Sequence, residues 1–158
     1  CLGNVAISIR ALAYILSIGP SGLRETAKAA CLSASYLRSR LAGLYDLPYP
    51  TPTLHEFVLS DRALKGTGVS TMDVAKALMD FGFHPPTVYF PLVVGGALMI
   101  EPTETEPIEE LDRFALAMEE IARRARENPE KLHGAPVTTP VGRVDEVLAA
   151  RSLVLTWP

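Results

Sequence analysis

The sequence predicts an α+β fold in which a small antiparallel sheet is covered by helices and preceded by two long helices. Two observations lead to this fold class. Long segments with apolar residues at helical spacing occur together with short apolar segments of strand length, separated by glycines and prolines. The resulting order is helix, helix, strand, helix, strand, strand, helix and tail, which suits a small antiparallel sheet with helices on one face.

The composition is that of an ordinary globular protein. The chain has 158 residues, of which 48% are hydrophobic and 21% charged, and its formal net charge is −3. A chain of this length buries roughly 70% of its unfolded surface, so it forms a core without disulfides. The acidic balance excludes nucleic-acid binding by bulk electrostatics. The two cysteines, Cys1 and Cys31, are too few for a disulfide framework, and we expect a reducing, cytoplasmic location.

The first helical segment, residues 5–18, is apolar on nearly every side, which predicts a helix enclosed by protein. It is shorter than the about 20 residues that span a bilayer, so we do not expect a membrane anchor. Its one charge, Arg10, is expected to meet a carboxylate or a phosphate. Two interpretations of this helix remain open. In the first, it is the central helix of this domain. In the second, the chain is a piece of a longer polypeptide that supplies the missing neighbours of the helix, as Cys1 in place of an initiating Met also indicates.

A second helix and a linker follow. Gly19-Pro20 breaks the first helix, and an apolar stripe predicts the second over residues 23–41, which Gly43 ends. Three closely spaced prolines then predict an extended linker over residues 48–52.

The predicted sheet comes next along the chain. Strands are expected over residues 54–59, 87–90 and 97–100, with a turn over residues 65–68. Ser70 and Asp73 have the spacing of a capping box, which predicts a helix through Phe81 that Gly82 ends.

The last long helix is predicted from Pro107 to about Arg126, with acidic residues at its start and arginines at its end that complement the helix dipole. From Asn128 onward the chain is Pro-rich and weakly patterned. The predicted organisation is a helical segment, a small α+β domain and an extended C-terminal tail, with boundaries 1–45, 46–128 and 129–158.

The chain contains no self-sufficient catalytic or phosphate-binding motif, and its histidines have no metal-ligand spacing, so we expect no metal site. His55 shares a predicted strand face with Phe57, which predicts that it points inward. His84 follows a helix end, where an imidazole often serves only to contact the negative end of the helix.

Two further segments are candidates for chemistry. Glu101 is the first of three carboxylates within residues 101–106, and paired carboxylates can perform acid–base chemistry. The same acids also suit the start of a helix, which is a purely structural interpretation. Asn4 precedes the first helix, where backbone amides favour an anion.

Several segments together resemble the glycine cleavage system P-protein, the pyridoxal-phosphate-dependent glycine decarboxylase. They include GFHPPTVYFP at residues 82–91 and MIEPTETE at residues 99–106, with residues 3–15 and 55–58. The tail around residues 135–147 looks like the end of the second subunit of the split bacterial form. The resemblance covers essentially the whole chain.

This resemblance implies that the chain is the C-terminal small domain of a fold-type I pyridoxal-phosphate enzyme. The complete enzyme would have an α/β fold. Residues 1–45 would then link to a cofactor-binding large domain, which carries the Schiff-base lysine upstream of Cys1. In the family this lysine follows a histidine, whereas none of the chain's four lysines does; they are Lys28, Lys65, Lys76 and Lys131. The resemblance therefore leaves no catalytic residue to assign, and the chain alone is expected to be inactive.

The resemblance also implies glycine as substrate, and a first P-protein subunit and a lipoyl-bearing H-protein as partners. His55, His84, Glu101 and Thr103 match the family's motifs and are candidates for the substrate or active site. Asn4 is a candidate for binding the pyridoxal phosphate, because the loop near it often reaches a partner subunit's cofactor phosphate. The alternatives are another fold-type I enzyme, such as an aminotransferase or cysteine desulfurase relative, and a non-catalytic α+β binding module.

Overall fold

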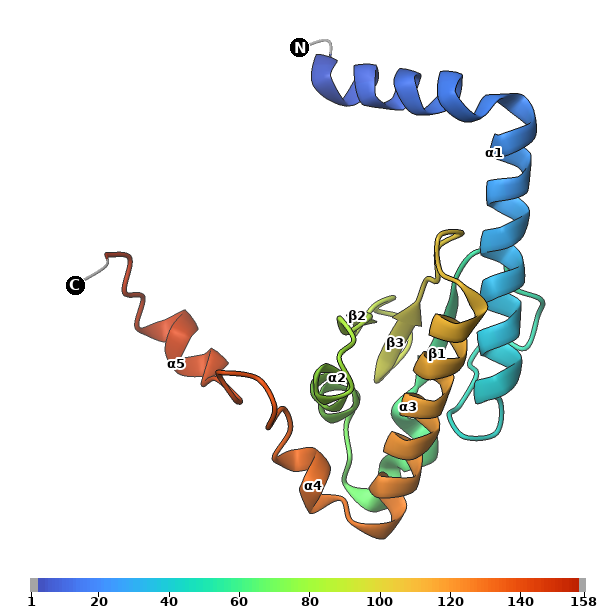
Figure 1. Cartoon of the computed structure of the whole chain (residues 1–158). Coiled ribbons are helices and arrows are strands. Elements are labelled where there is room, and N and C mark those ends of the chain that lie inside the picture. Colours follow the sequence, from blue (N-terminus) through green and yellow to red (C-terminus); the bar gives the residue numbers. More distant parts are fainter. Residues whose placement is uncertain (1–2, 157–158) are drawn as a thin grey trace.

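The computed structural model describes residues 3–156 (Figure 1). Its elements, in chain order, are α1 (Val5–Leu41), β1 (Phe57–Ser60), the 3₁₀ helix η1 (Asp61–Thr67), α2 (Thr71–Asp80), β2 (Thr87–Val88), β3 (Ala97–Ile100), α3 (Ile108–Glu127), α4 (Glu130–His133) and α5 (Glu146–Arg151). The strands form one antiparallel sheet in the order β1-β3-β2. The predicted α+β class with a small antiparallel sheet is therefore confirmed.

The resemblance places the Schiff-base lysine upstream of Cys1. Cys1 itself lies outside the described residues. The position of that lysine therefore stays a prediction from the family resemblance. The other cysteine, Cys31, lies on α1 with a free thiol that is partly buried.

One face of the sheet is built into the core. Leu59 lies opposite Leu98, and both side chains are buried. Phe57 and Ile100, the next pair on this face, are buried as well. Met99, whose side chain points to the other face, is only half-buried. The core thus lies on the side of the sheet that the helices cover.

Helix α3 is the centre of the helical packing, because it contacts α1, α2, η1 and α4. Its buried stripe consists of Leu111, Ala115, Ala117, Met118, Ile121, Ala122 and Ala125. The hydroxyl of Tyr45 donates to the carbonyl of Met118 at 2.9 Å, and burial raises the pKa of Tyr45. Arg40 of α1 joins the two helices through Asp112 and Glu119 of α3, at 2.9 and 2.8 Å. These contacts hold the second half of α1 against α3.

The predicted break in the first helical region appears as a sharp bend within α1 (Figure 1). Gly19 has φ 64° and ψ −178°, which a residue with a side chain rarely adopts. The half before the bend projects away from the rest of the molecule (Figure 1), and residues 3–17 are all exposed. The interpretation of this helix as the central helix of the domain is therefore wrong. The core closes instead around Ala34, Leu37 and Leu41 of the second half.

The remaining differences from the predicted elements are local. Strand β1 begins at Phe57 rather than at residue 54, β2 ends at Val88, and the predicted turn at 65–68 lies largely within η1. The capping box at Ser70 and Asp73 is confirmed. The tail contains the short helices α4 and α5, which have too few residues to show an apolar period.

The first part of the tail is fixed to α2. The carboxylate of Asp80 accepts hydrogen bonds from the backbone N–H groups of Val137 and Thr138, each at 2.8 Å. Arg143 donates to the carboxylate of Asp73 at 2.5 Å. The residues from 144 to 156 are all exposed. The tail is thus anchored up to Arg143 and leaves the body beyond it (Figure 1).

Candidate functional site

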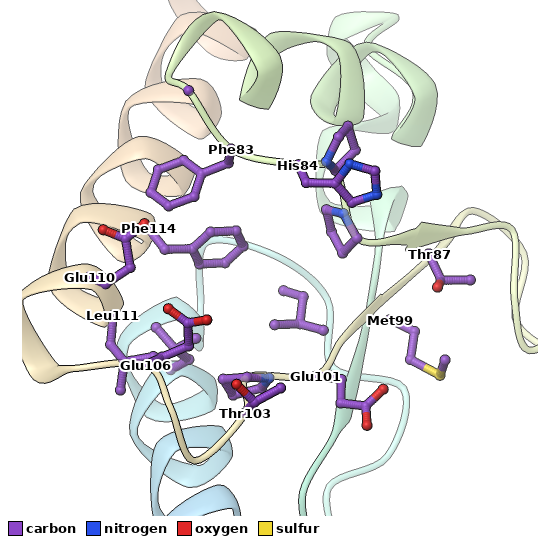
Figure 2. A pocket seen from close by; sticks show the side chains of 16 residues that line it. Phe83, His84, Thr87, Met99, Glu101, Thr103, Glu106, Glu110, Leu111 and Phe114 are labelled. Carbon is purple, nitrogen blue, oxygen red and sulfur yellow. The ribbon is translucent and has the colours of Figure 1, made fainter. Parts of the chain in front are cut away.

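One cavity among the described residues has a volume of about 530 Å³. Its lining side chains come from the start of α3, from the segment that joins α2 to β2, and from β3 with the loop that follows it (Figure 2). Leu37 of α1 completes the lining. The cavity therefore lies where four parts of the fold meet.

One wall of the cavity is aromatic. The rings of Phe83 and Phe114 meet edge to face, with their centroids 5.3 Å apart. The guanidinium of Arg113 lies over Phe83 at 4.6 Å from the ring centroid and donates to Glu110 at 2.7 Å. This packing gives the cavity one apolar side.

The polar groups include three residues that the sequence singled out, namely His84, Glu101 and Thr103. They are joined by Glu106 and Glu110 (Figure 2). Within residues 3–156, the lining contains three carboxylates and no lysine or arginine. The cavity therefore favours hydrogen-bond donors and cations over anions.

His55 lies in a neighbouring cavity of about 430 Å³ that also includes Glu101 and Thr103 in its lining. Its Nε2 is 3.8 Å from Oε1 of Glu101. The prediction that His55 points inward with Phe57 is wrong, because its side chain is 52% exposed. The strand begins only at Phe57, so the alternation of faces does not extend back to His55.

Asn4 lies apart from these four residues. Its side-chain oxygen accepts a hydrogen bond from the backbone N–H of Ile7 at 3.3 Å, which makes it the N-cap of α1. It lines neither of the two cavities described above. The structure therefore gathers His55, His84, Glu101 and Thr103 around two adjoining cavities, whereas Asn4 is the N-cap of α1. The half of α1 that begins there projects away from the rest of the molecule (Figure 1).

The residues of the larger cavity do not by themselves fit pyridoxal phosphate. That cofactor needs a lysine amine for its aldehyde and cationic or N–H groups for its phosphate. Neither a lysine nor an arginine of the described chain lines this cavity, and the carboxylates of Glu101 and Glu106, which no arginine or lysine pairs within residues 3–156, would repel a phosphate. Within residues 3–156 there is also no group of three or more His, Cys, Asp or Glu side chains arranged to hold a metal ion.

Most of the chain matches a known family. The model of a family described as "Glycine dehydrogenase, C-terminal domain" matches residues 26–135. The chain belongs to this family. The resemblance seen in the motifs is thereby confirmed, and the alternative of an aminotransferase or desulfurase relative is wrong.

Individual relatives agree with this assignment. The protein named "Probable glycine dehydrogenase (decarboxylating) subunit 2" of Chlorobium phaeovibrioides is 58% identical over 96% of this chain and 31% of its own length. The proteins of the same name from Bacillus velezensis and Caldanaerobacter subterraneus are 56% and 53% identical, each over 98% of this chain and 32% of their own length. The chain therefore spans about a third of the length of these relatives.

Several cavity residues were not singled out in the sequence. Glu110 and Leu111 both lie next to Phe114, because residues four and three positions apart are neighbours on a helix surface. Leu37 belongs to the apolar stripe of the second half of α1, where its pattern predicts only core packing. The helical spacing of these residues predicts that they lie on one buried side of their helix. It does not predict whether that side lines a cavity or packs in the core.

Proposed function

We propose that this chain is the C-terminal small domain of a fold-type I, pyridoxal-phosphate-dependent glycine decarboxylase. The complete enzyme would decarboxylate glycine and pass the aminomethyl group to the lipoyl arm of an H-protein, together with a first P-protein subunit and in the cytoplasm. The observation that carries this proposal is the 53–58% identity over nearly the whole chain to proteins named for that activity.

In this proposal the chain supplies one wall of the substrate site. The aromatic pair Phe83 and Phe114 keeps water out, and the side chains of His84 and Glu101 offer hydrogen bonds to neutral or cationic groups. The carboxylate of glycine and the phosphate of the cofactor would be held by the rest of the protein, because the three carboxylates of this cavity disfavour anions.

The proposal also includes that the chain is inactive on its own. None of its four lysines lines either of the two cavities around the candidate residues. The lysine that anchors the cofactor would therefore lie elsewhere in the complete polypeptide, upstream of Cys1. Purified chain mixed with pyridoxal phosphate is expected to show no stoichiometric cofactor absorbance band after desalting, and a persisting band would contradict this part of the proposal.

The proposed function is tested with the complete second subunit, the first subunit and a lipoylated H-protein. We expect this mixture to release carbon dioxide from the carboxyl group of glycine. Glu101→Gln in the complete protein should lower kcat/KM about 10- to 100-fold, the equivalent of one lost hydrogen bond to a charged group. The measurement is radiolabelled carbon dioxide release at varied glycine concentration.

Glu109→Gln is the matched control, because Glu109 is an exposed glutamate of α3 that does not line the cavity. Its kcat/KM should equal that of the unmodified enzyme. A complete mixture that leaves glycine untouched would contradict the proposed activity. Equal rates for the two variants would instead remove Glu101 from the site and leave the activity assignment standing.

Asn4 gives a separate prediction. If it reaches the cofactor phosphate in the complete enzyme, Asn4→Ala should weaken pyridoxal-phosphate binding, which equilibrium dialysis measures. If Asn4 only caps α1, the same variant should leave cofactor binding unchanged and destabilise the helix end by about 1 kcal/mol. Unchanged binding would remove Asn4 from the cofactor site.

A further inference from the structure

Arg113 of α3 lies beside the larger cavity but does not line it. Its guanidinium makes two contacts with residues that do line the cavity. It lies over the ring of Phe83, at 4.6 Å from the centroid, and it donates to the carboxylate of Glu110 at 2.7 Å. Figure 2 shows Phe83, Glu110 and Phe114 together on one side of the cavity. Arg113 therefore holds part of the cavity wall from outside the cavity.

The ring of Phe83 is held by two successive residues of α3. Phe83 itself belongs to the irregular segment between α2 and β2. Phe114 meets its ring edge to face, at an interplanar angle of 89°, and Arg113 lies over it. His84, the next residue along the chain, lines the cavity. A displacement of Phe83 would therefore move both the aromatic wall and the backbone that carries His84.

The ion pair with Arg113 also determines where the negative charge of the cavity lies. A guanidinium is planar and permanently charged, so it stacks on a ring and pairs with a carboxylate at the same time. The pairing compensates the charge of Glu110. The uncompensated negative charge of the lining is then concentrated at Glu101 and Glu106.

Arg123 provides an internal comparison on the same helix. It pairs with Glu120 at 2.7 Å, as Arg113 pairs with Glu110, and both pairs join residues three positions apart. The side chains of Arg113 and Arg123 are 57% and 53% exposed. Arg123 lines neither cavity, and among the described residues its guanidinium lies over no aromatic ring. The two arginines thus differ mainly in the contact of Arg113 with the cavity wall.

We propose that Arg113 is a positioning residue of the substrate site, which fixes Phe83 and Glu110 in the wall against which glycine binds. This inference rests on the proposed function, in which the cavity forms one wall of that site. The wall contacts the substrate before and during the reaction alike, so a displaced wall weakens both states equally. Such a loss raises KM and leaves kcat unchanged.

The test compares Arg113→Ala with Arg123→Ala in the complete second subunit, together with the first subunit and a lipoylated H-protein. Exposed ion pairs contribute little to stability, so we expect both variants to fold. Arg113→Ala should raise the KM for glycine about 3- to 10-fold at unchanged kcat, the size expected for one cation–aromatic contact. Arg123→Ala should change neither constant. Arg113→Lys should recover part of the KM, because an ammonium still reaches Glu110 but does not stack as a plane.

A second measurement reports glycine binding without turnover. The complete second subunit carries 4-fluorophenylalanine at position 83, and its fluorine resonance is followed by nuclear magnetic resonance as glycine is added, with the first subunit present and the H-protein left out. We expect the resonance to shift, and the midpoint of the titration to lie at about 3- to 10-fold more glycine when Arg113→Ala is also present.

Three results would overturn the positioning role while the proposed function stands. They are an unchanged KM for Arg113→Ala, a lower kcat at unchanged KM, as a smaller folded fraction alone would give, and an equal rise of KM in Arg123→Ala. A fluorine resonance that does not respond to glycine would also overturn it, since the wall would then lie outside the substrate site. Absence of carbon dioxide release by the unmodified mixture would instead contradict the proposed function, and the positioning role with it.

Discussion

Leu37→Ala is expected to lower the free energy of unfolding of the chain by about 2–5 kcal/mol. The Leu37 side chain is 2% exposed and lies on the half of α1 that packs against α3. Its truncation removes apolar contacts and leaves a hole that the neighbouring side chains close only in part. Urea unfolding followed by far-ultraviolet circular dichroism measures the change.

Leu32→Ala provides the control for this prediction. Leu32 lies on the same helix and is 72% exposed, so its truncation should change the free energy of unfolding by no more than about 0.5 kcal/mol. Both variants remove the same atoms from α1, and the difference in their effects isolates the contribution of burial. Losses of equal size would contradict the packing of α1 on α3.

The periodic parts of the fold could be predicted from the sequence. The apolar stripe of α3, the capping box at Ser70 and Asp73 and the strand at residues 97–100 all rest on local patterns that the structure retains. The bend at Gly19-Pro20 could be predicted from the sequence, because glycine permits unusual backbone angles and proline disrupts the hydrogen bonding of a helix. These features depend on nearest neighbours in the chain, and local sequence is sufficient to encode them.

The positions of the first half of α1 and of the tail could not be predicted in the same way. The pattern of residues 5–18 predicts enclosure, but it does not say which part of the protein encloses them, and here residues 5–17 are exposed. Helix α4 is held by its buried Leu132 and by contacts with α2 and α3, and α5 begins at the capping residue Asp145. Such long-range contacts leave no regular trace in the sequence.

The candidate site was predicted in part. His84, Glu101 and Thr103 were chosen because they lie in the segments that resemble the family, and the fold brings them to one cavity. The orientation of His55 was wrong because the strand begins two residues later, at Phe57. The aromatic wall could not be predicted, because Phe83 and Phe114 meet only through the packing of α3 beside the segment after α2.

The other large effect is expected at Asp73, which joins α2 to the tail. Its carboxylate accepts hydrogen bonds from the backbone N–H and the hydroxyl of Ser70, at 2.8 and 2.7 Å, and from Arg143 at 2.5 Å. Nδ1 of His133 lies 3.5 Å away. Burial favours the neutral form, but the hydrogen bonds and the charge of Arg143 outweigh it and hold the pKa of Asp73 below its ordinary value.

Asp73→Asn is therefore expected to lower the free energy of unfolding by about 1–3 kcal/mol at pH 7. Because the pKa of Asp73 is lower in the folded chain than in the unfolded chain, its charged form stabilises the fold above the unfolded value of about 3.9. This stabilisation is lost as the pH falls through the folded pKa, so the difference between the two proteins should shrink below about pH 4.

Urea unfolding of the Asp73 variant at a series of pH values between 7 and 3 tests this dependence. Glu109→Gln serves as the control, because this exposed carboxylate contributes only the smaller interaction with the dipole at the start of α3. A difference that stays constant down to pH 3 would mean that the shape of the Asp73 side chain, and not its charge, holds the tail on α2. A difference that shrinks as expected would identify the ion pair with Arg143 and the hydrogen bonds from Ser70 as its source, since these contacts favour the charged form.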